Sequence, residues 1–244
     1  MNTELARFNM IEQQIRPWEV LDQAVLSLLA TVRREDFVPP ALKALAFVDT
    51  QVPLGDGQSM LEPKVEARLL QELQVQRHER VLEVGTGSGF MAALLAHRAM
   101  HVVSLECRPV LAAAARESLA RNGIANVKVV DVLAAAGAHG LPAEAPFDVI
   151  VLSGSVAEVP LQLLQQLKPG GRLVAVVGEE PIMRARLFTA AGDSAGDSAG
   201  DSAGGAAGRA AGNPPGSAGY TETDLFDTVA PRLEGFVEPS RFFF

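Results

Sequence analysis

The sequence predicts an α/β fold with a mostly parallel sheet, and three patterns point to it. Apolar runs suited to buried strands alternate with helix-forming stretches across residues 80–177. The run at 81–84 ends in alternating glycines at 85–89, directly before a small, apolar, helix-forming stretch. A second run, 101–105, ends at an acidic residue, Glu106. Such alternation places parallel strands side by side, with helices on both faces of the sheet.

The elements before the sheet are expected to be mainly helical. Apolar residues recur at helical spacing within residues 1–50, and Pro39-Pro40 precedes a further short helix. Residues 51–63 are rich in Gly and Pro and predict a loop, whereas residues 64–73 predict an amphipathic helix. Strands are then expected at 80–84, 101–105, 126–130, 147–152 and 172–177, and helices at 89–97, 109–121 and 158–167.

The C-terminal part predicts two further strands, which bring the sheet to seven. Residues 184–189 and 221–229 alternate in hydropathy and are expected to pair as an antiparallel hairpin. Between them, Gly-Asp-Ser-Ala occurs three times in tandem, which favours a flexible surface insertion over a tether for a partner. The terminal residues 242–244, all Phe, are expected to form the buried end of a last strand rather than a docking tag. The whole chain, 1–244, is interpreted as one domain: cap and substrate loop 1–78, core 79–190, insertion 191–219 and C-terminal strands 220–244.

Composition excludes several classes of function. The net charge of −8 argues against a fold-wide attraction to nucleic acid or to an anionic membrane. With one cysteine, Cys107, there is no internal disulfide, and the four histidines show no metal-ligand spacing, so no metal is expected. No apolar run is long enough to span a membrane, so a cytoplasmic protein without a membrane partner is expected. The oligomeric state stays open.

The glycine turn predicts a ligand that carries a ribose. Glycines let the backbone turn sharply, and the helix that follows offers free N–H groups to an anionic group. Glu106, at the end of the next strand, is placed to accept both ribose hydroxyls. A dinucleotide site wants Gly-x-Gly-x-x-Gly; here the third glycine, Gly89, comes one residue early, and Phe90 stands where that pattern has Gly.

The turn resembles motif I of class I S-adenosylmethionine-dependent methyltransferases, whose pattern is Glu-x-Gly-x-Gly-x-Gly. Residues 168–174 resemble the late helix-to-strand turn of that superfamily, and Asp131 sits where such enzymes contact the adenine amine. The resemblance implies a Rossmann-like fold and S-adenosyl-L-methionine as cofactor. The cofactor contacts it implies are Gln58, Met60, Glu83, Gly85, Thr86, Gly87, Ser88, Gly89, Glu106, Cys107, Asp131 and Val132.

The region ahead of the turn narrows the resemblance. Residues 33–39, 46–49 and 53–59 look like the N-terminal region of the protein-L-isoaspartate O-methyltransferase family, and the likeness covers roughly residues 5–180. It implies methyl transfer to the α-carboxyl of isoaspartyl residues in proteins or peptides, which starts repair of damaged sites.

This chain departs from the family pattern on the substrate side. The family's Thr-Ile-Ser reads here as Ser59-Met60-Leu61, so the second hydroxyl is missing, and an acidic Glu62 follows. After the fourth strand of the core, the family has Thr-Ala-Ala, and this chain has Leu-Ser-Gly-Ser at residues 152–155. The family's Pro-Val-Gly after the fifth strand becomes Val-Val-Gly at 176–178.

Positioning is the main task expected of the site, because an ionised carboxylate acceptor needs no general base. Ser59 is the predicted catalytic residue, with the backbone around Gln58 and Met60 holding the acceptor; the alternative for Ser59 is an ordinary loop serine. Substrate contacts are predicted for Asp49, Leu61 and Ser153. The alternatives are a turn residue for Asp49, strand ends for Ser153 and Ser155, a turn cap for Asp131 and a small strand-end hydrophobe for Cys107.

Three other functions stay open at this point. Leu61 and Glu62 favour a methyltransferase of the same family with a different acceptor, because a carboxylate near the pocket repels another. A cofactor-binding protein without chemistry is the second, and a nicotinamide oxidoreductase, which Phe90 argues against, is the third.

Overall fold

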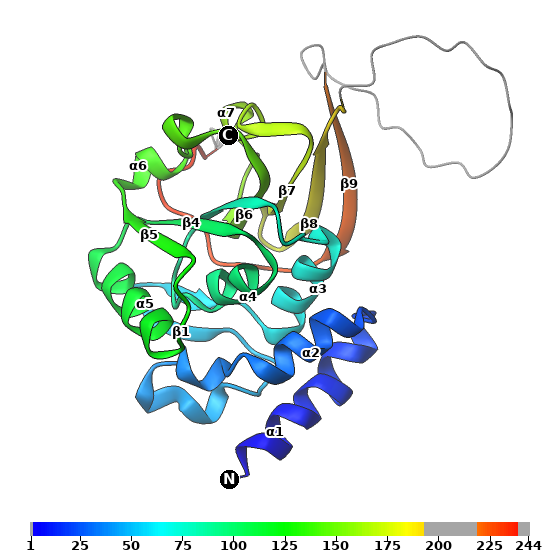
Figure 1. Cartoon of the computed structure of the whole chain (residues 1–244), viewed down its shortest axis with the longest axis vertical. Helices are drawn as coiled ribbons and strands as arrows, with labels where there is room; N and C mark the ends of the chain where they lie inside the picture. Colours follow the sequence, from blue (N-terminus) through cyan, green and yellow to red (C-terminus); the bar gives the residue numbers. More distant parts are fainter. Residues whose placement is uncertain (1, 193–218, 239–244) are drawn as a thin grey trace, which may run out of the picture.

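A computed structural model describes residues 2–192 and 219–238 of the chain. Its centre is a seven-stranded sheet with the order β5-β4-β3-β6-β7-β8-β9 (Figure 1). The first five strands in this order pair in parallel, and β7, β8 and β9 pair antiparallel. The predicted fold class is therefore confirmed. The strands are β3 (Arg80–Val84), β4 (His101–Glu106), β5 (Val127–Asp131), β6 (Phe147–Val156), β7 (Leu167–Glu179), β8 (Ile182–Ala190) and β9 (Tyr220–Asp227).

Helices cover the sheet, and further helices precede it in the N-terminal part of the chain. Figure 1 shows α1 and α2 gathered at one end of the molecule, away from β8 and β9. Two groups of buried apolar side chains fill the interior, and the group that includes the cap is the larger one. The α-helices are α1 (Thr3–Met10), α2 (Gln23–Thr31), α3 (Pro63–Leu73), α4 (Phe90–Arg98), α5 (Pro109–Arg121), α6 (Ala134–Gly137) and α7 (Leu161–Leu164); the short helical turns are η1 (Ile11–Ile15), η2 (Arg16–Trp18), η3 (Arg34–Asp36), η4 (Pro40–Leu45) and η5 (Pro142–Glu144).

The strand order reverses at β3, which lies between β4 and β6. In an open parallel sheet, such a reversal leaves a crevice at the carboxyl ends of the strands, and ligands bind there. The glycine turn begins at Gly85, directly after β3, and therefore sits in this crevice.

The structure corrects the prediction of a plain loop at 51–63. β1 (Val52–Gly55) and β2 (Gln58–Met60) form a separate two-stranded antiparallel sheet. Gly55, Asp56 and Gly57 all have positive φ angles, of 101°, 50° and 75°, and they make the tight turn that joins the two strands. The hairpin is anchored because Val52 and Met60 are buried side by side.

Two further boundaries differ from the prediction. The helix expected at 158–167 is limited to α7, because Pro160 precedes it and β7 already begins at Leu167. β6 runs on to Val156, so Ser153 and Ser155 lie within a strand rather than after it. The repeats of the insertion and residues 242–244 lie outside the described residues.

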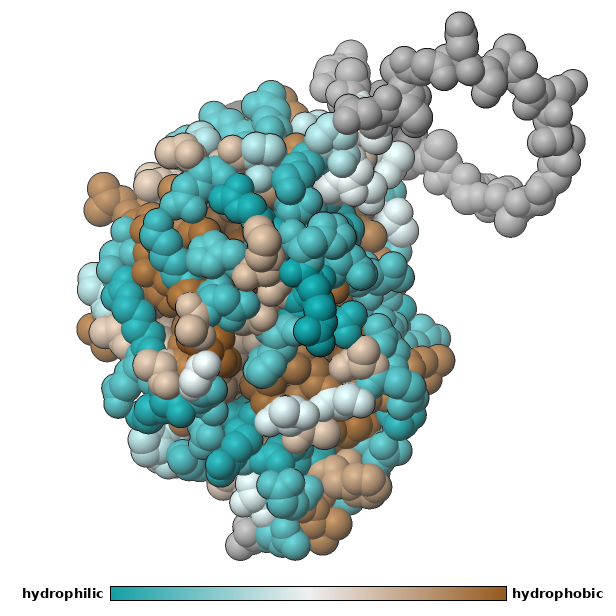
Figure 2. All heavy atoms as spheres, viewed as in Figure 1, coloured by the Kyte–Doolittle hydropathy of each residue, from teal (hydrophilic) through white to brown (hydrophobic). Residues whose placement is uncertain are grey.

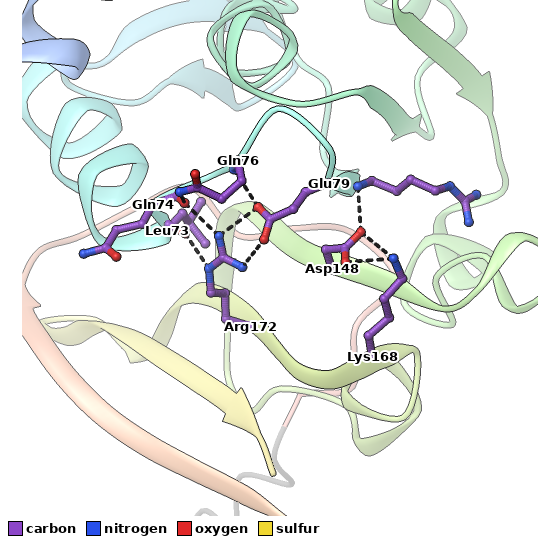
Figure 3. A network of polar contacts seen from close by, with 8 residues as sticks. Leu73, Gln74, Gln76, Glu79, Asp148, Lys168 and Arg172 are labelled. Carbon is purple, nitrogen blue, oxygen red and sulfur yellow. Dashed lines mark hydrogen bonds and ion pairs between the residues drawn. The ribbon is translucent and has the colours of Figure 1, made fainter. Parts of the chain in front are cut away.

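The amino ends of the sheet are tied together by Arg172 of β7 (Figure 3). Its guanidinium makes a bidentate ion pair with Glu79, with N–O distances of 2.7 and 2.9 Å. It also donates hydrogen bonds to the carbonyls of Leu73 and Gln74 at the end of α3. Lys168 pairs with Asp148, which also accepts the backbone N–H of Arg80 at 2.8 Å. The residues of the predicted late turn thus fix the end of the sheet opposite the glycine turn.

The outer edge is an antiparallel hairpin of β8 and β9, as predicted. Just beyond these strands, the backbone N–H of Ala191 donates to the carbonyl of Gly219 at 2.6 Å, so the two ends of the insertion are held together. Hydrophilic residues cover most of the face shown in Figure 2, with hydrophobic patches between them. None of the helices within residues 2–192 and 219–238 has the length and apolar composition that crossing a membrane requires.

Candidate active site

The glycine turn requires glycine for both conformation and space. Gly85, Gly87 and Gly89 have φ angles of 94°, 52° and 84°, a region that other residues rarely adopt. A Cβ on Gly89 would lie 3.2 Å from the Cβ of Ala115, so glycine also lets α4 start close against α5. The turn thereby leaves bare backbone exposed at the start of a helix.

Glu106 lies beside this turn at the end of β4. The side chain is buried, at 5% exposure, and its two oxygens accept the backbone N–H groups of Gly87 at 2.8 Å and Arg108 at 3.0 Å. These bonds fix the carboxylate at the sheet edge while leaving it further acceptor capacity. The predicted position of Glu106 in the crevice is thus what the structure shows.

A cavity opens over the turn. Apolar side chains from several elements, such as Leu105, Leu111 and Val132, provide its walls, and Glu106 and Ser59 provide polar groups. The complete lining is Leu54, Gln58, Ser59, Val84, Gly85, Gly87, Leu105, Glu106, Cys107, Arg108, Leu111, Val132, Ala134, Gly137, Ser153, Leu233, Glu234 and Phe236.

A C-terminal segment, residues 230–236, forms the roof of the cavity, and the sequence pattern does not predict this role. Ser155 of β6 holds the segment through three hydrogen bonds: its Oγ donates to the carbonyl of Ala230 at 2.8 Å, and its backbone pairs with Pro231 and Leu233. Glu234 forms an ion pair with Arg108. No sequence signal marks this role, because the segment has neither a strand nor a helix pattern.

A smaller cavity adjoins the first one. It is closed on one side by the β1–β2 hairpin and on the other by the glycine turn. Five residues line both cavities: Leu54, Ser59, Gly85, Gly87 and Ser153. The remaining lining is Met60, Leu61, Glu66, Glu83, Thr86, Ser88 and Met91.

A closed hydrogen-bond network lies under the turn. Glu83 is fully buried, and its two carboxylate oxygens accept the hydroxyls of Ser104 at 2.6 Å and Ser153 at 2.7 Å. The hydroxyls of Ser104 and Thr86 are 2.5 Å apart. Burial raises the pKa of Glu83 to about 7, although the two serine hydrogen bonds oppose the shift.

A buried ion pair lies at the wall of the smaller cavity, to which it contributes Glu66. Arg34 pairs with Glu66 and donates to the carbonyl of Leu61 at 2.7 Å, and its guanidinium lies 4.9 Å from the ring centre of Phe90. Burial raises the pKa of Glu66, and the charge of Arg34 opposes that shift. The sequence predicts a site role for neither residue, because a charge inside a helical segment normally indicates a solvent-exposed face.

Several predicted site residues lie elsewhere. Asp131 is half exposed, pairs with Arg116 and is absent from the lining of both cavities. Asp49 pairs with Lys64 at 2.7 Å, also outside both linings, and Glu62 accepts a hydrogen bond from Gln51 at 3.4 Å. Glu62 is likewise absent from the lining of both cavities, whereas Glu66 and Glu83 line the smaller one.

Leu61, in contrast, is buried in the wall of the smaller cavity, at 4% exposure. Ser88 lines that cavity and accepts the backbone N–H of Phe90 at 3.3 Å. Cys107 lines the larger cavity, and burial, together with nearby carboxylates, raises the pKa of its thiol to about 11, so it stays protonated at neutral pH. Within the part of the chain that the structure describes, no three metal-ligating side chains cluster.

Comparison with known proteins gives a consistent family. The family described as "Protein-L-isoaspartate(D-aspartate) O-methyltransferase" matches residues 6–197. A protein-L-isoaspartate O-methyltransferase from Methanoculleus marisnigri is 44% identical over 172 residues, which cover 70% of this chain and 77% of that protein. Another, from Myxococcus xanthus, is 45% identical over 159 residues, covering 65% and 74% of the two chains.

Solved structures agree on the fold. A protein-L-isoaspartate O-methyltransferase with 26% identity superposes with a TM-score of 0.63, covering 77% of this chain and 60% of the other. A structure from Plasmodium falciparum, described as a complex with S-adenosyl-L-homocysteine, has 19% identity and a TM-score of 0.69 over 96% and 99% of the two chains. The family match over residues 6–197 and these relatives show that the chain belongs to the protein-L-isoaspartate(D-aspartate) O-methyltransferase family.

Proposed function

We propose that this chain transfers a methyl group from S-adenosyl-L-methionine to the free α-carboxylate of an isoaspartyl residue in a protein or peptide. The observation that carries the proposal is the pair of joined cavities. The larger one lies at the glycine turn and Glu106, and the smaller one meets it at Ser59 and Ser153. A donor in the first and an acceptor in the second would meet at the shared boundary.

The residues of the larger cavity suit this cofactor. A Cβ on Gly87 would lie 3.3 Å from Leu54, and one on Gly85 would collide with Leu233, so bare backbone faces the space where the amino-acid end would bind. Glu106 would accept the ribose hydroxyls, and Leu105, Leu111 and Val132 would pack against the adenine. When bound, the cofactor supplies a methyl group on a positively charged sulfur.

The protein contributes alignment rather than proton transfer. A carboxylate acceptor is ionised at neutral pH, so its attack on the methyl carbon needs no general base. The hairpin β1–β2 places Ser59 at the boundary of the two cavities, where its hydroxyl would hold the acceptor in line. Leu61, in the wall, offers only apolar contact.

The biological role and the cellular location of this activity belong to the same proposal. Methylation of an isoaspartyl carboxylate would begin the repair of damaged protein sites, and the site of action would be the cytoplasm. Contacts of Asp49, Leu61 and Ser153 with substrate, and of the twelve predicted residues with cofactor, are proposals of the same kind. Of these, Asp131 is the one whose position supports it least, because Arg116 already engages its carboxylate.

The test is methyl transfer from radiolabelled S-adenosylmethionine to an isoaspartyl peptide and to its aspartyl twin. We expect label on the isoaspartyl peptide alone, and the aspartyl twin serves as the control. Label on neither peptide, with the cofactor bound, would contradict the proposal. It would favour a family member with another acceptor, the candidate that the hydrophobic Leu61 wall supports.

A further inference from the structure

The boundary between the two cavities holds two hydroxyl groups. Of the five residues that line both cavities, Leu54, Gly85 and Gly87 offer no polar side chain, whereas Ser59 and Ser153 do. They come from different elements, Ser59 from β2 and Ser153 from β6. An acceptor in the smaller cavity would therefore meet a donor in the larger one beside these two hydroxyls.

The hydroxyl of Ser153 already donates its one hydrogen bond within the protein. It donates to Glu83 at 2.7 Å, and the other oxygen of that carboxylate is occupied by Ser104 at 2.6 Å. Because a serine hydroxyl has one proton, Ser153 presents only lone pairs to the cavities while Glu83 is ionised. It is therefore suited to a group that donates a hydrogen bond.

The hydroxyl of Ser59, in contrast, is free to donate a hydrogen bond. Its side chain makes no hydrogen bond to any other residue within 2–192 or 219–238, so its proton is available. A carboxylate can only accept hydrogen bonds when ionised, and Ser59 is suited to donate to one. The boundary thus offers one donor and one acceptor.

We propose that Ser59 and Ser153 together select the isoaspartyl unit, Ser59 by donating to the acceptor carboxylate and Ser153 by accepting the amide N–H on the same α-carbon. This inference rests on the proposed function. In an isoaspartyl residue, the free carboxylate and the amide N–H are attached to one carbon. In an ordinary aspartyl residue, the side-chain carboxylate is one carbon further from that N–H. Two hydroxyls carried by separate strands, with that of Ser153 held by Glu83, would therefore distinguish the two spacings, and Ser153 is a specificity-determining residue.

The test removes the N–H from the substrate without adding bulk. Two isoaspartyl peptides are compared, one normal and one in which an ester oxygen replaces the amide N–H of the isoaspartyl residue. Both are assayed with the unchanged enzyme, Ser153→Ala and Ser153→Thr, on the alkaline side of pH 7, where Glu83 is ionised. For the unchanged enzyme, the ester should lower kcat/KM on the order of tenfold, mainly through KM, because one hydrogen bond is lost and two lone pairs face each other.

The variants give distinct expectations. Ser153→Ala should methylate the normal peptide less efficiently and discriminate less than about twofold against the ester, because it has no lone pair to repel the ester oxygen. Ser153→Thr keeps the hydroxyl and should keep the discrimination. Ser59→Ala should slow both peptides equally, because it acts on the carboxylate that they share.

A structural role for Ser153 would show differently. If the substitution only disturbs the network under the glycine turn, affinity for S-adenosylhomocysteine in a calorimetric titration will fall. The ester will then lower kcat/KM of Ser153→Ala by the same factor as it lowers kcat/KM of the unchanged enzyme. That result overturns the inference and leaves the proposed function standing. No methylation of the normal isoaspartyl peptide by the unchanged enzyme would overturn both.

Discussion

Glu83 is a carboxyl group buried without a cation beside it. Its only hydrogen-bond partners in the described residues are two hydroxyls, Ser104 and Ser153, and burial raises its pKa to about 7. A buried charge stabilised only by dipoles costs folding free energy as soon as it forms. The residue thus makes the stability of the domain depend on pH.

We expect Glu83→Gln to flatten the pH dependence of stability. Between its ordinary pKa of 4.5 and about 7, the folded protein keeps a proton that the unfolded chain releases, so stability falls as pH rises through this range. The loss due to this group is roughly 3 kcal/mol, and glutamine, which does not ionise, removes it. Urea unfolding of both proteins at a series of pH values between 4.5 and 7.5 measures the effect, and parallel curves would contradict it.

At the scale of residues, the sequence predicts positions set by local geometry better than pairings between distant segments. Gly85 and Glu106 follow from the local strand–turn–helix pattern, which short-range geometry determines. Arg34 and Glu66 could not be predicted, because their pairing joins segments 32 residues apart and depends on how α3 packs against the turn that carries Arg34. Asp131 shows the converse, since a neighbouring arginine engages a residue that position alone would assign to the cofactor.

At the scale of elements, the segment 230–236 closes the larger cavity by contact with α6. Gly235 has a φ angle of 82°, and a Cβ there would overlap the backbone of Ala134. Glu234, its neighbour, pairs with Arg108, which follows β4. The contacts that hold the roof therefore include this close backbone approach, the Glu234–Arg108 ion pair and the three hydrogen bonds of Ser155.

We expect Gly235→Ala to lift this segment and weaken cofactor binding. The added methyl group cannot be accommodated against Ala134, so the dissociation constant for S-adenosylhomocysteine should rise on the order of tenfold, as a titration will show.

The matched control is Gly123→Ala. Gly123 has a similar positive φ, 68°, with nothing near its missing Cβ, and it lies away from both cavities. It should lower stability by about 1 kcal/mol and leave affinity unchanged. Equal affinities for the two variants would show that the roof does not contribute to binding.

Elements with strong periodicity are predicted closely, and those defined by contacts are not. The helix at 109–121 is found at the predicted residues because its pattern is local. The β1–β2 hairpin is missed because its strands are too short to show alternation, and only burial of Val52 and Met60 reveals them. The predicted helix at 158–167 is too long, since Leu167 is taken up by β7.

At the scale of the whole molecule, a cofactor held between the sheet edge and the roof should stabilise the fold. With S-adenosylhomocysteine at about 100 times its dissociation constant, the expected gain is about 2.7 kcal/mol. For a chain of this size, that gain raises Tm by roughly 5–10 °C. A thermal melt measures it, and a nicotinamide dinucleotide at the same concentration should leave Tm unchanged. A shift with the dinucleotide alone would contradict the assignment of the cavity.

The hydrogen bond between Ala191 and Gly219 makes the far edge of the sheet a natural point for engineering. Because the two chain ends already meet there, the entropy of closing the connection grows only logarithmically with its length. Shortening it, or grafting a fluorescent reporter domain in its place, would impose little strain on β8 and β9. Because β8 and β9 lie at one edge of the sheet and the crevice lies at β3 and β4, a reporter grafted at this edge would leave the crevice intact.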